Sequence, residues 1–125
     1  MSDTIPEVRV ERVDTSGNLS RIDVRMHVRN QSSDRVEIIE CEMLGRRNGM
    51  SHCLDAGQTT DITIYQGQPP KDENQRRVYV RFKRLGDGRT FRADYDARYD
   101  RRTDNNGNAW YEPSRMDLQG RAYPG

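Results

Sequence analysis

Two cysteines and two histidines are the residues of this 125-residue chain best suited to cross-linking or metal binding. Cys41 and Cys53 flank the polar stretch GRRNG at residues 45–49. If that stretch is a five-residue hairpin loop, Cys41 lies directly opposite Cys53, and cross-strand cysteines can come close enough for a disulfide. The sequence therefore predicts a disulfide in an oxidising environment, and reduced thiols that pack as small apolar groups in the cytoplasm.

Zinc is the alternative for the same region, with Cys41, His52 and Cys53 as ligands and His27 as a distant fourth. Neighbouring residues on a strand point to opposite faces, so His52 and Cys53 do not converge on one ion. The chain has no Cys-x-x-Cys or His-x₃-His spacing. We expect no metal site and no other cofactor.

The segment Asp104–Gly107 has the oxygen donors and the glycine of a calcium loop. With Gly107 as the turn glycine of an EF-hand, Arg102 and Pro113 occupy the first and twelfth positions, where carboxylates are required. The EF-hand reading therefore fails, and a turn rich in Asn and Gly explains the segment without a metal. A looser carboxylate site remains open, using Asp100, Asp104 and Glu112.

Motifs for catalysis are absent from the sequence, which contains no G-x-S-x-G, no phosphate-binding loop and no H-E-x-x-H. Asp94 and Asp96 fall on one face of an expected strand, opposite Tyr79 and Arg77, the usual arrangement of surface pairs. We therefore predict a protein that is not an enzyme.

The composition predicts one small domain with a thin core. Only 32% of the residues are hydrophobic and 33% are charged, and the formal net charge is +1. Every valine and isoleucine lies between Ile5 and Val80. The N-terminal ten residues lack an apolar signal region, and no run approaches the ~20 apolar residues of a membrane span. We expect no membrane span, and either a cytoplasmic product or one whose leader was removed.

Alternation of apolar and polar residues, typical of strands, dominates the chain as far as residue 96. Ile22, Val24, Met26 and Val28 share one face in the clearest example. The break in the alternation at Val13 predicts a β-bulge or the end of a strand, and the break near Ile38 predicts a β-bulge. About seven strands are expected, around residues 8–13, 21–28, 36–44, 50–54, 59–65, 78–84 and 89–96.

The last of these hairpins has a defined expected register. Gly86-Asp87 would form a two-residue type II′ loop, with glycine first. That register pairs Phe82 with Phe91 on one face. Two further pairs follow on the same face and two on the other, namely Val80 with Ala93, Val78 with Tyr95, Tyr79 with Asp94 and Arg77 with Asp96.

Seven regularly spaced strands predict an all-β, antiparallel sandwich of the immunoglobulin or fibronectin type III class. The stretch VRNQSSDRVEIIE followed by LDAGQTTDITIY resembles small bacterial and phage Ig-like domains, in which a strand ends in Asn-x-Ser and a later one follows Leu-x-x-Gly. Among these the chain is similar to YcfL-like envelope proteins and to Ig-like accessory domains of phage particles. The resemblance covers residues 20–82, and it implies a binding or structural role.

Residues 97–125 lack valine and isoleucine but contain four of the nine aromatic residues, interleaved with arginines. This composition is typical of protein–protein contacts. We therefore predict a sandwich at residues 1–96 and an extended, partner-clasping arm at residues 97–125. The partner-binding residues predicted in the arm are Tyr99, Trp110, Tyr111, Arg115 and Tyr123.

The outer face of the last hairpin supplies further candidates for partner binding, namely Tyr79, Arg81, Lys83 and Arg92. A basic strand face beside an aromatic ring could also follow a phosphate backbone. Asp94 and Asp96 neutralise that face, so a nucleic-acid partner is not expected.

By elimination, the sequence predicts a structural subunit of a larger assembly. The first hypothesis is a phage virion protein made in the host cytoplasm, either a capsid decoration protein or a tail or neck accessory. Its partners would be other subunits, such as the major capsid or tail protein, or further copies of itself. The alternative is an envelope-associated or carbohydrate-binding Ig-like module, in which surface Tyr and Trp side chains would stack on sugars.

Overall fold

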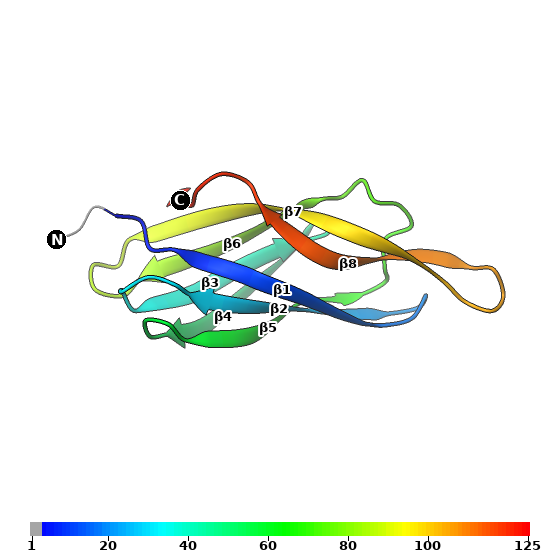
Figure 1. Ribbon diagram of the computed structural model, residues 1–125, viewed down its shortest axis with the longest axis horizontal. Helices are drawn as coiled ribbons and strands as arrows, with labels where there is room; N and C mark the ends of the chain where they lie inside the picture. Colours follow the sequence, from blue (N-terminus) through cyan, green and yellow to red (C-terminus); the bar gives the residue numbers. More distant parts are fainter. Residues whose placement is uncertain (1–3) are drawn as a thin grey trace.

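The computed structural model describes residues 4–125, and no helix occurs among them. The strands form two antiparallel sheets that face each other as a sandwich (Figure 1). One sheet has the order β1-β2-β5, and the other has the order β4-β3-β6-β7-β8 with β9 also paired to β7. This confirms the all-β, Ig-like prediction at the level of architecture. The strands are β1 (Val8–Gly17), β2 (Ile22–Asn30), β3 (Val36–Met43), β4 (Arg46–Leu54), β5 (Thr59–Gly67), β6 (Arg77–Arg84), β7 (Thr90–Thr103), β8 (Ala109–Leu118) and β9 (Tyr123–Pro124).

The core lies between the two sheets and is built from alternating residues of both. Phe82 and Phe91 stack at its centre, with ring centroids 5.7 Å apart. The four residues of β2 predicted to share a face are all completely buried. The predicted bulges are also present, as register shifts between Val10 and Arg12 and between Ile38 and Glu40.

The β6–β7 hairpin has the predicted register at every one of the five pairs, but its turn differs. The amide of Gly88 donates to the carbonyl of Arg84, and the left-handed residue is Gly88 (φ +72°) rather than Gly86. A type II′ turn needs a positive φ at its first central residue, so that prediction is wrong. The loop between β6 and β7 is therefore longer than the two residues expected. The Asp87 carboxylate accepts hydrogen bonds from Arg84, and this contact stabilises the loop.

The β3–β4 hairpin has a much shorter loop than expected, which separates the cysteines. Leu44 and Gly45 form a two-residue turn, both with positive φ (+52° and +73°), as in a type I′ turn. Cys41 therefore pairs with Asn48, while Cys53 pairs with Glu37. The predicted bridge is wrong, because Glu37 is four residues from Cys41, about 13 Å along the strand. Cys41 is buried and Cys53 is exposed, both as free thiols.

Residues 97–125 belong to the sandwich, and the prediction of a separate arm is wrong. β7 runs without a break across the expected boundary at residues 96 and 97. Its second half pairs with β8, and its first half pairs with β9 on that same edge, the one opposite β6. Trp110, Met116 and Ala97 are buried in the common core. The edge of β7 offers unpaired backbone groups, so a segment with few β-branched residues still pairs there.

Candidate interaction surface

Six of the nine predicted partner-binding residues lie on one surface, the side of the larger sheet that faces away from the core. We call this surface, formed by alternate residues of β3, β6, β7, β8 and β9, the outer face. Successive residues of a strand point to opposite sides, so the apolar alternation that fills the core places the polar residues here. The six residues are Tyr79, Arg81, Lys83, Arg92, Arg115 and Tyr123.

An aromatic and charged cluster forms the centre of the outer face. The Arg92 guanidinium lies 4.0 Å from the centroid of the Tyr79 ring. Its Nε atom is 2.8 Å from the carboxylate of Asp94, which also accepts a 2.5 Å hydrogen bond from the Tyr123 hydroxyl. The Tyr79 hydroxyl donates to Glu40 at 2.7 Å. These contacts hold two tyrosine rings and one arginine in fixed positions. Tyr79 is only 6% exposed, so it supports Arg92 and offers little of its own ring to a partner, whereas Tyr123 is exposed.

Ion pairs link further charged residues of the outer face to neighbouring strands. Arg81 lies 3.6 Å from Glu40, and Lys83 lies 3.5 Å from Glu37. On the β8 side, both Arg98 and Arg115 contact Asp117, at 2.8 and 2.9 Å. The outer face is therefore acidic on β3, basic on β6 and of mixed charge on β7 and β8.

The acid–base properties of the outer face follow from these contacts. Burial, reinforced by the hydrogen bond to Glu40, raises the pKa of Tyr79 to about 12. The hydrogen bond from Arg98 lowers the pKa of Asp117, and the contact with Asp94 raises the pKa of Tyr123. The tyrosines are therefore neutral and Asp117 is ionised at neutral pH.

The other three predicted binding residues lie elsewhere. Trp110 is only 7% exposed, and its indole N–H donates to Glu112 at 3.1 Å. Tyr99 donates from its hydroxyl to the carbonyl of Gln75, and burial raises its pKa to about 12. Tyr111 is half-buried, and its amide donates to the carbonyl of Pro70. Trp110 is thus a core residue and offers no exposed ring for stacking on a sugar.

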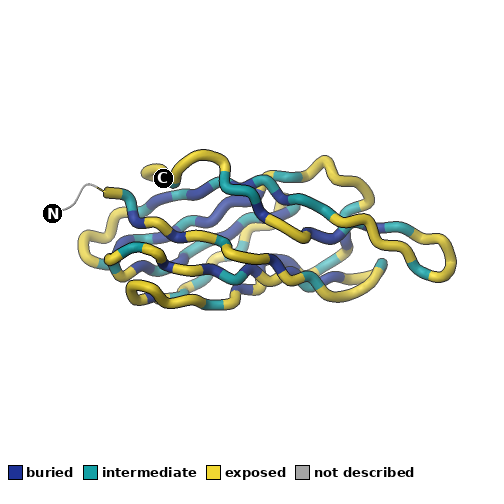
Figure 2. Tube along the Cα trace, viewed as in Figure 1, coloured by how far each residue is buried: buried dark blue, intermediate teal, exposed yellow. Residues whose placement is uncertain are grey.

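The outer end of the β7–β8 hairpin extends past the ends of the other strands (Figures 1 and 2). Residues 100–103 and 105–108 are exposed. The Asp104 carboxylate accepts hydrogen bonds from the amides of Asn106 and Asn108 and from the Asn108 side chain. These contacts make residues 104–108 a capped turn, and across residues 4–125 no cluster of three or more His, Cys, Asp or Glu side chains could hold a metal ion.

Two buried polar side chains, which sequence reasoning missed, hold one end of the sandwich together. Asn30 is completely buried, and its amide group donates to the carbonyls of Asp34, Leu54 and Asp55. Its own backbone also exchanges hydrogen bonds with Gly57 and Gln58. The Asn-x-Ser and Leu-x-x-Gly motifs noted in the sequence are therefore in direct contact.

Arg84 is the second of these residues, with a side chain that is 6% exposed. It contacts Asp87 through two nitrogens, donates to the carbonyl of Thr4 and lies 5.3 Å from the Phe91 ring centroid. The Arg-x-x-Asp spacing was the only signal in the sequence, and it is common among surface pairs. Its role depends on the fold, which brings the N-terminal segment and the β6–β7 turn to the same place.

Among the described residues, no helix has the length and apolar character needed to cross a membrane. Comparison with models of protein families, with curated proteins and with solved structures found no match to this chain.

Proposed function

We propose that this protein is a non-enzymatic structural subunit that docks on a neighbouring protein of a larger assembly through the outer face. A virion accessory role, as a capsid decoration or a tail or neck protein, is the specific form of this proposal. The observation that carries it is the clustering of the exposed Tyr123 with Arg92 and flanking arginines on one side of the sandwich, where the buried Tyr79 ring supports Arg92 from beneath. Tyr and Arg are the residue types that contribute most at protein interfaces.

The fixed positions of these side chains favour binding. Association costs free energy for each flexible side chain that becomes ordered. Arg92 is already held between Tyr79 and Asp94, so it has little freedom left to lose. In an assembly with many copies, weak contacts of this kind add up to stable attachment.

The charges of the outer face favour a protein partner over a nucleic acid. Glu37, Glu40, Asp94 and Asp117 lie among its basic residues and pair with them. A phosphate backbone would meet these carboxylates as well as the arginines, and the net charge of +1 offers little general attraction. A protein surface with charges complementary to this mixed pattern satisfies both signs.

Site-specific photo-crosslinking in the native cell tests the proposal. A photoreactive amino acid replaces Arg81, Lys83 or Arg115 in three separate variants, and a matched control replaces Thr63 on β5 of the other sheet. We expect all three outer-face variants to cross-link to the same protein in a rapidly sedimenting particle fraction. The control should not cross-link to that protein.

Two results would refute the proposal. One is cross-linking from Thr63 at the level of the outer-face positions. The other is an outer face that yields no cross-linked protein while the chain sediments as a free monomer. Charge reversal at Arg81 and Arg115 should also release the protein from the particle fraction, whereas Thr63→Glu should leave it bound.

A further inference from the structure

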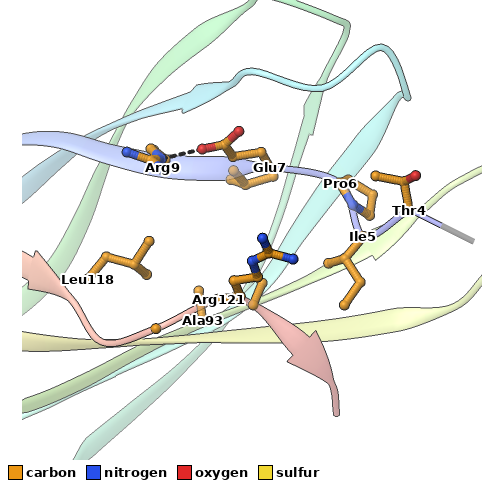
Figure 3. A pocket seen from close by; sticks show the side chains of 11 residues that line it. Thr4, Ile5, Pro6, Glu7, Arg9, Ala93, Leu118 and Arg121 are labelled. Carbon is orange, nitrogen blue, oxygen red and sulfur yellow. Dashed lines mark ion pairs between the residues drawn. The ribbon is translucent and has the colours of Figure 1, made fainter.

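A cleft of about 680 Å³ opens between the start of β1 and the chain that joins β8 to β9 (Figure 3). It exists because residues 120–122, between β8 and β9, do not pair with β7. The amide of Gln119 donates to the backbone carbonyl of Asp94, and Tyr123 pairs with Arg92. Between these two contacts, residues 120–122 lie opposite the single residue Ala93 of β7. Residues 120–122 therefore bulge away from the sheet, and a small residue, Ala93, lies beneath them.

The cleft is lined by both apolar and polar groups and carries an unmatched positive charge at its edge. Glu7 and Arg9 neutralise each other through a 2.5 Å ion pair. Arg121 is exposed, and no hydrogen bond, ion pair or ring contact of its side chain occurs within residues 4–125 (Figure 3). The charged residues lining the cleft thus sum to +1. Its apolar lining consists of Ile5, Pro6, Val8, Ala93, Leu118 and Ala122.

Backbone groups on both walls are available to a ligand. On the β1 side, the Ile5 amide donates no hydrogen bond within the described chain, whereas further along the strand the Val10 amide is already bonded to the Tyr95 hydroxyl. On the opposite wall, the amides of Arg121 and Ala122 likewise donate to no acceptor in residues 4–125. Two walls of non-helical chain with free amides, with apolar side chains such as Leu118 and Ala122 between them, match the way an extended peptide binds beside a strand.

We propose that this cleft binds an extended segment of the partner protein, with one apolar side chain over Ala93 and Leu118 and a carboxylate paired with Arg121. The proposal rests on the assembly role proposed above and adds the chemistry of the partner segment. A peptide fits better than a compact small molecule, because the cleft is open along one side and bordered by chain with free amides. The carboxylate is specified by the uncompensated guanidinium.

The probe is the peptide acetyl-Ser-Val-Ile-Glu-Val-Ser-amide, titrated into the full chain and followed by methyl NMR. We expect shift changes confined to the methyl groups that line the cleft, those of Ile5, Val8, Ala93, Leu118 and Ala122. Replacing Glu by Gln in the peptide, or Arg121→Gln in the protein, should weaken binding about tenfold or more, since a charge-assisted contact is lost. Arg101→Gln, an exposed arginine at the far end of the β7–β8 hairpin, is the matched control and should bind the peptide normally.

Three results would overturn the proposal: no shift changes at millimolar peptide, equal binding of the Glu and Gln peptides, or decanoate producing the cleft shifts while the peptide does not. The last result would identify a site for small amphipathic acids. Thermal unfolding of Arg121→Gln should match that of the wild type, which excludes loss of fold as the cause. The photo-crosslinks from Arg81 and Lys83 report on the outer face separately, so failure of the cleft proposal and failure of the assembly proposal are distinguishable.

Discussion

β7 is shared by two hairpins that are held together in different ways. In the β6–β7 hairpin the ladder has no register shift, and inward residues such as Phe82 and Phe91 pack against each other across the strands. In the β7–β8 hairpin the register shifts between Arg98 and Tyr99, and the exposed outer end lies beyond the other strands (Figure 2). The first hairpin forms the centre of the core, while the second covers an edge and presents polar surface.

The difference shows how one long strand can serve both stability and exposure. Where β7 lies between β6 and its other neighbours, alternate side chains are buried and the backbone is paired on both sides except beside Ala93. From Asp100 onward its side chains are exposed, and the hairpin is held at its base by Trp110 and the surrounding contacts. The base of the β7–β8 hairpin is therefore where β7 changes from a buried strand of the core to an exposed one.

The largest expected effects come from removing a buried ring from either hairpin. Trp110→Ala should lower the free energy of unfolding of the isolated protein by about 3 kcal/mol, because it removes a buried ring and leaves Glu112 without the indole donor. Phe82→Ala, in the β6–β7 hairpin, should cost about 4 kcal/mol. Urea denaturation of both variants measures the comparison. An unchanged unfolding midpoint for Trp110→Ala would mean that the hairpin base contributes nothing to the domain.

The same comparison explains which parts of the fold the sequence predicts. β6 and the first half of β7 alternate apolar and polar residues on both faces, so one register satisfies every pair. β8 contains proline, glutamate and no β-branched residue, and nothing in its own pattern indicates a strand. It is a strand because β7 offers an edge and because Trp110 and Met116 reach the core. Local patterns cannot reveal a strand that depends on its neighbours in this way.

The outer face likewise contains residues that the sequence predicts and others that depend on distant parts of the chain. The residues of β6 and β7 on the outer face follow from alternation, and the structure brings them together as the register requires. Tyr123 joins them only because β9 returns to the edge of β7. The buried Arg84 and Asn30 could not be identified from the sequence, since each acts on segments that are distant along the chain.

A smaller effect distinguishes the observed β6–β7 turn from the type II′ turn that its sequence suggests. Gly88 has φ +72° and Gly86 does not have a positive φ, while a Cβ added at either residue meets nothing within 4 Å. Gly88→Ala should therefore destabilise the protein by about 1 kcal/mol through backbone strain alone. Gly86→Ala should be neutral or slightly stabilising. Thermal unfolding of the two variants decides the matter, and a type II′ turn would give the reverse order.

The smallest effect concerns the aspartates in the two turns, Asp87 in the β6–β7 hairpin and Asp104 in the β7–β8 hairpin. Hydrogen bonds from Arg84 lower the pKa of Asp87, and those from Asn108 lower the pKa of Asp104. A carboxyl whose pKa is lower in the folded state stabilises it above the unfolded value, ordinarily 3.8, and this contribution is lost as the pH falls through the folded value. Acid should therefore weaken both turns.

The two aspartates should differ in how much of the acid sensitivity they carry. Asp87 pairs with a buried arginine, whereas Asp104 is bonded to exposed amides and carries no ion pair within residues 4–125. Asp87→Asn should reduce the loss of stability between pH 7 and pH 3 more than Asp104→Asn does. Urea denaturation of the wild type and both variants at the two pH values measures this difference. Equal losses of stability in the two variants between pH 7 and pH 3 would show that pairing with Arg84 adds nothing to the contribution of the Asp87 charge.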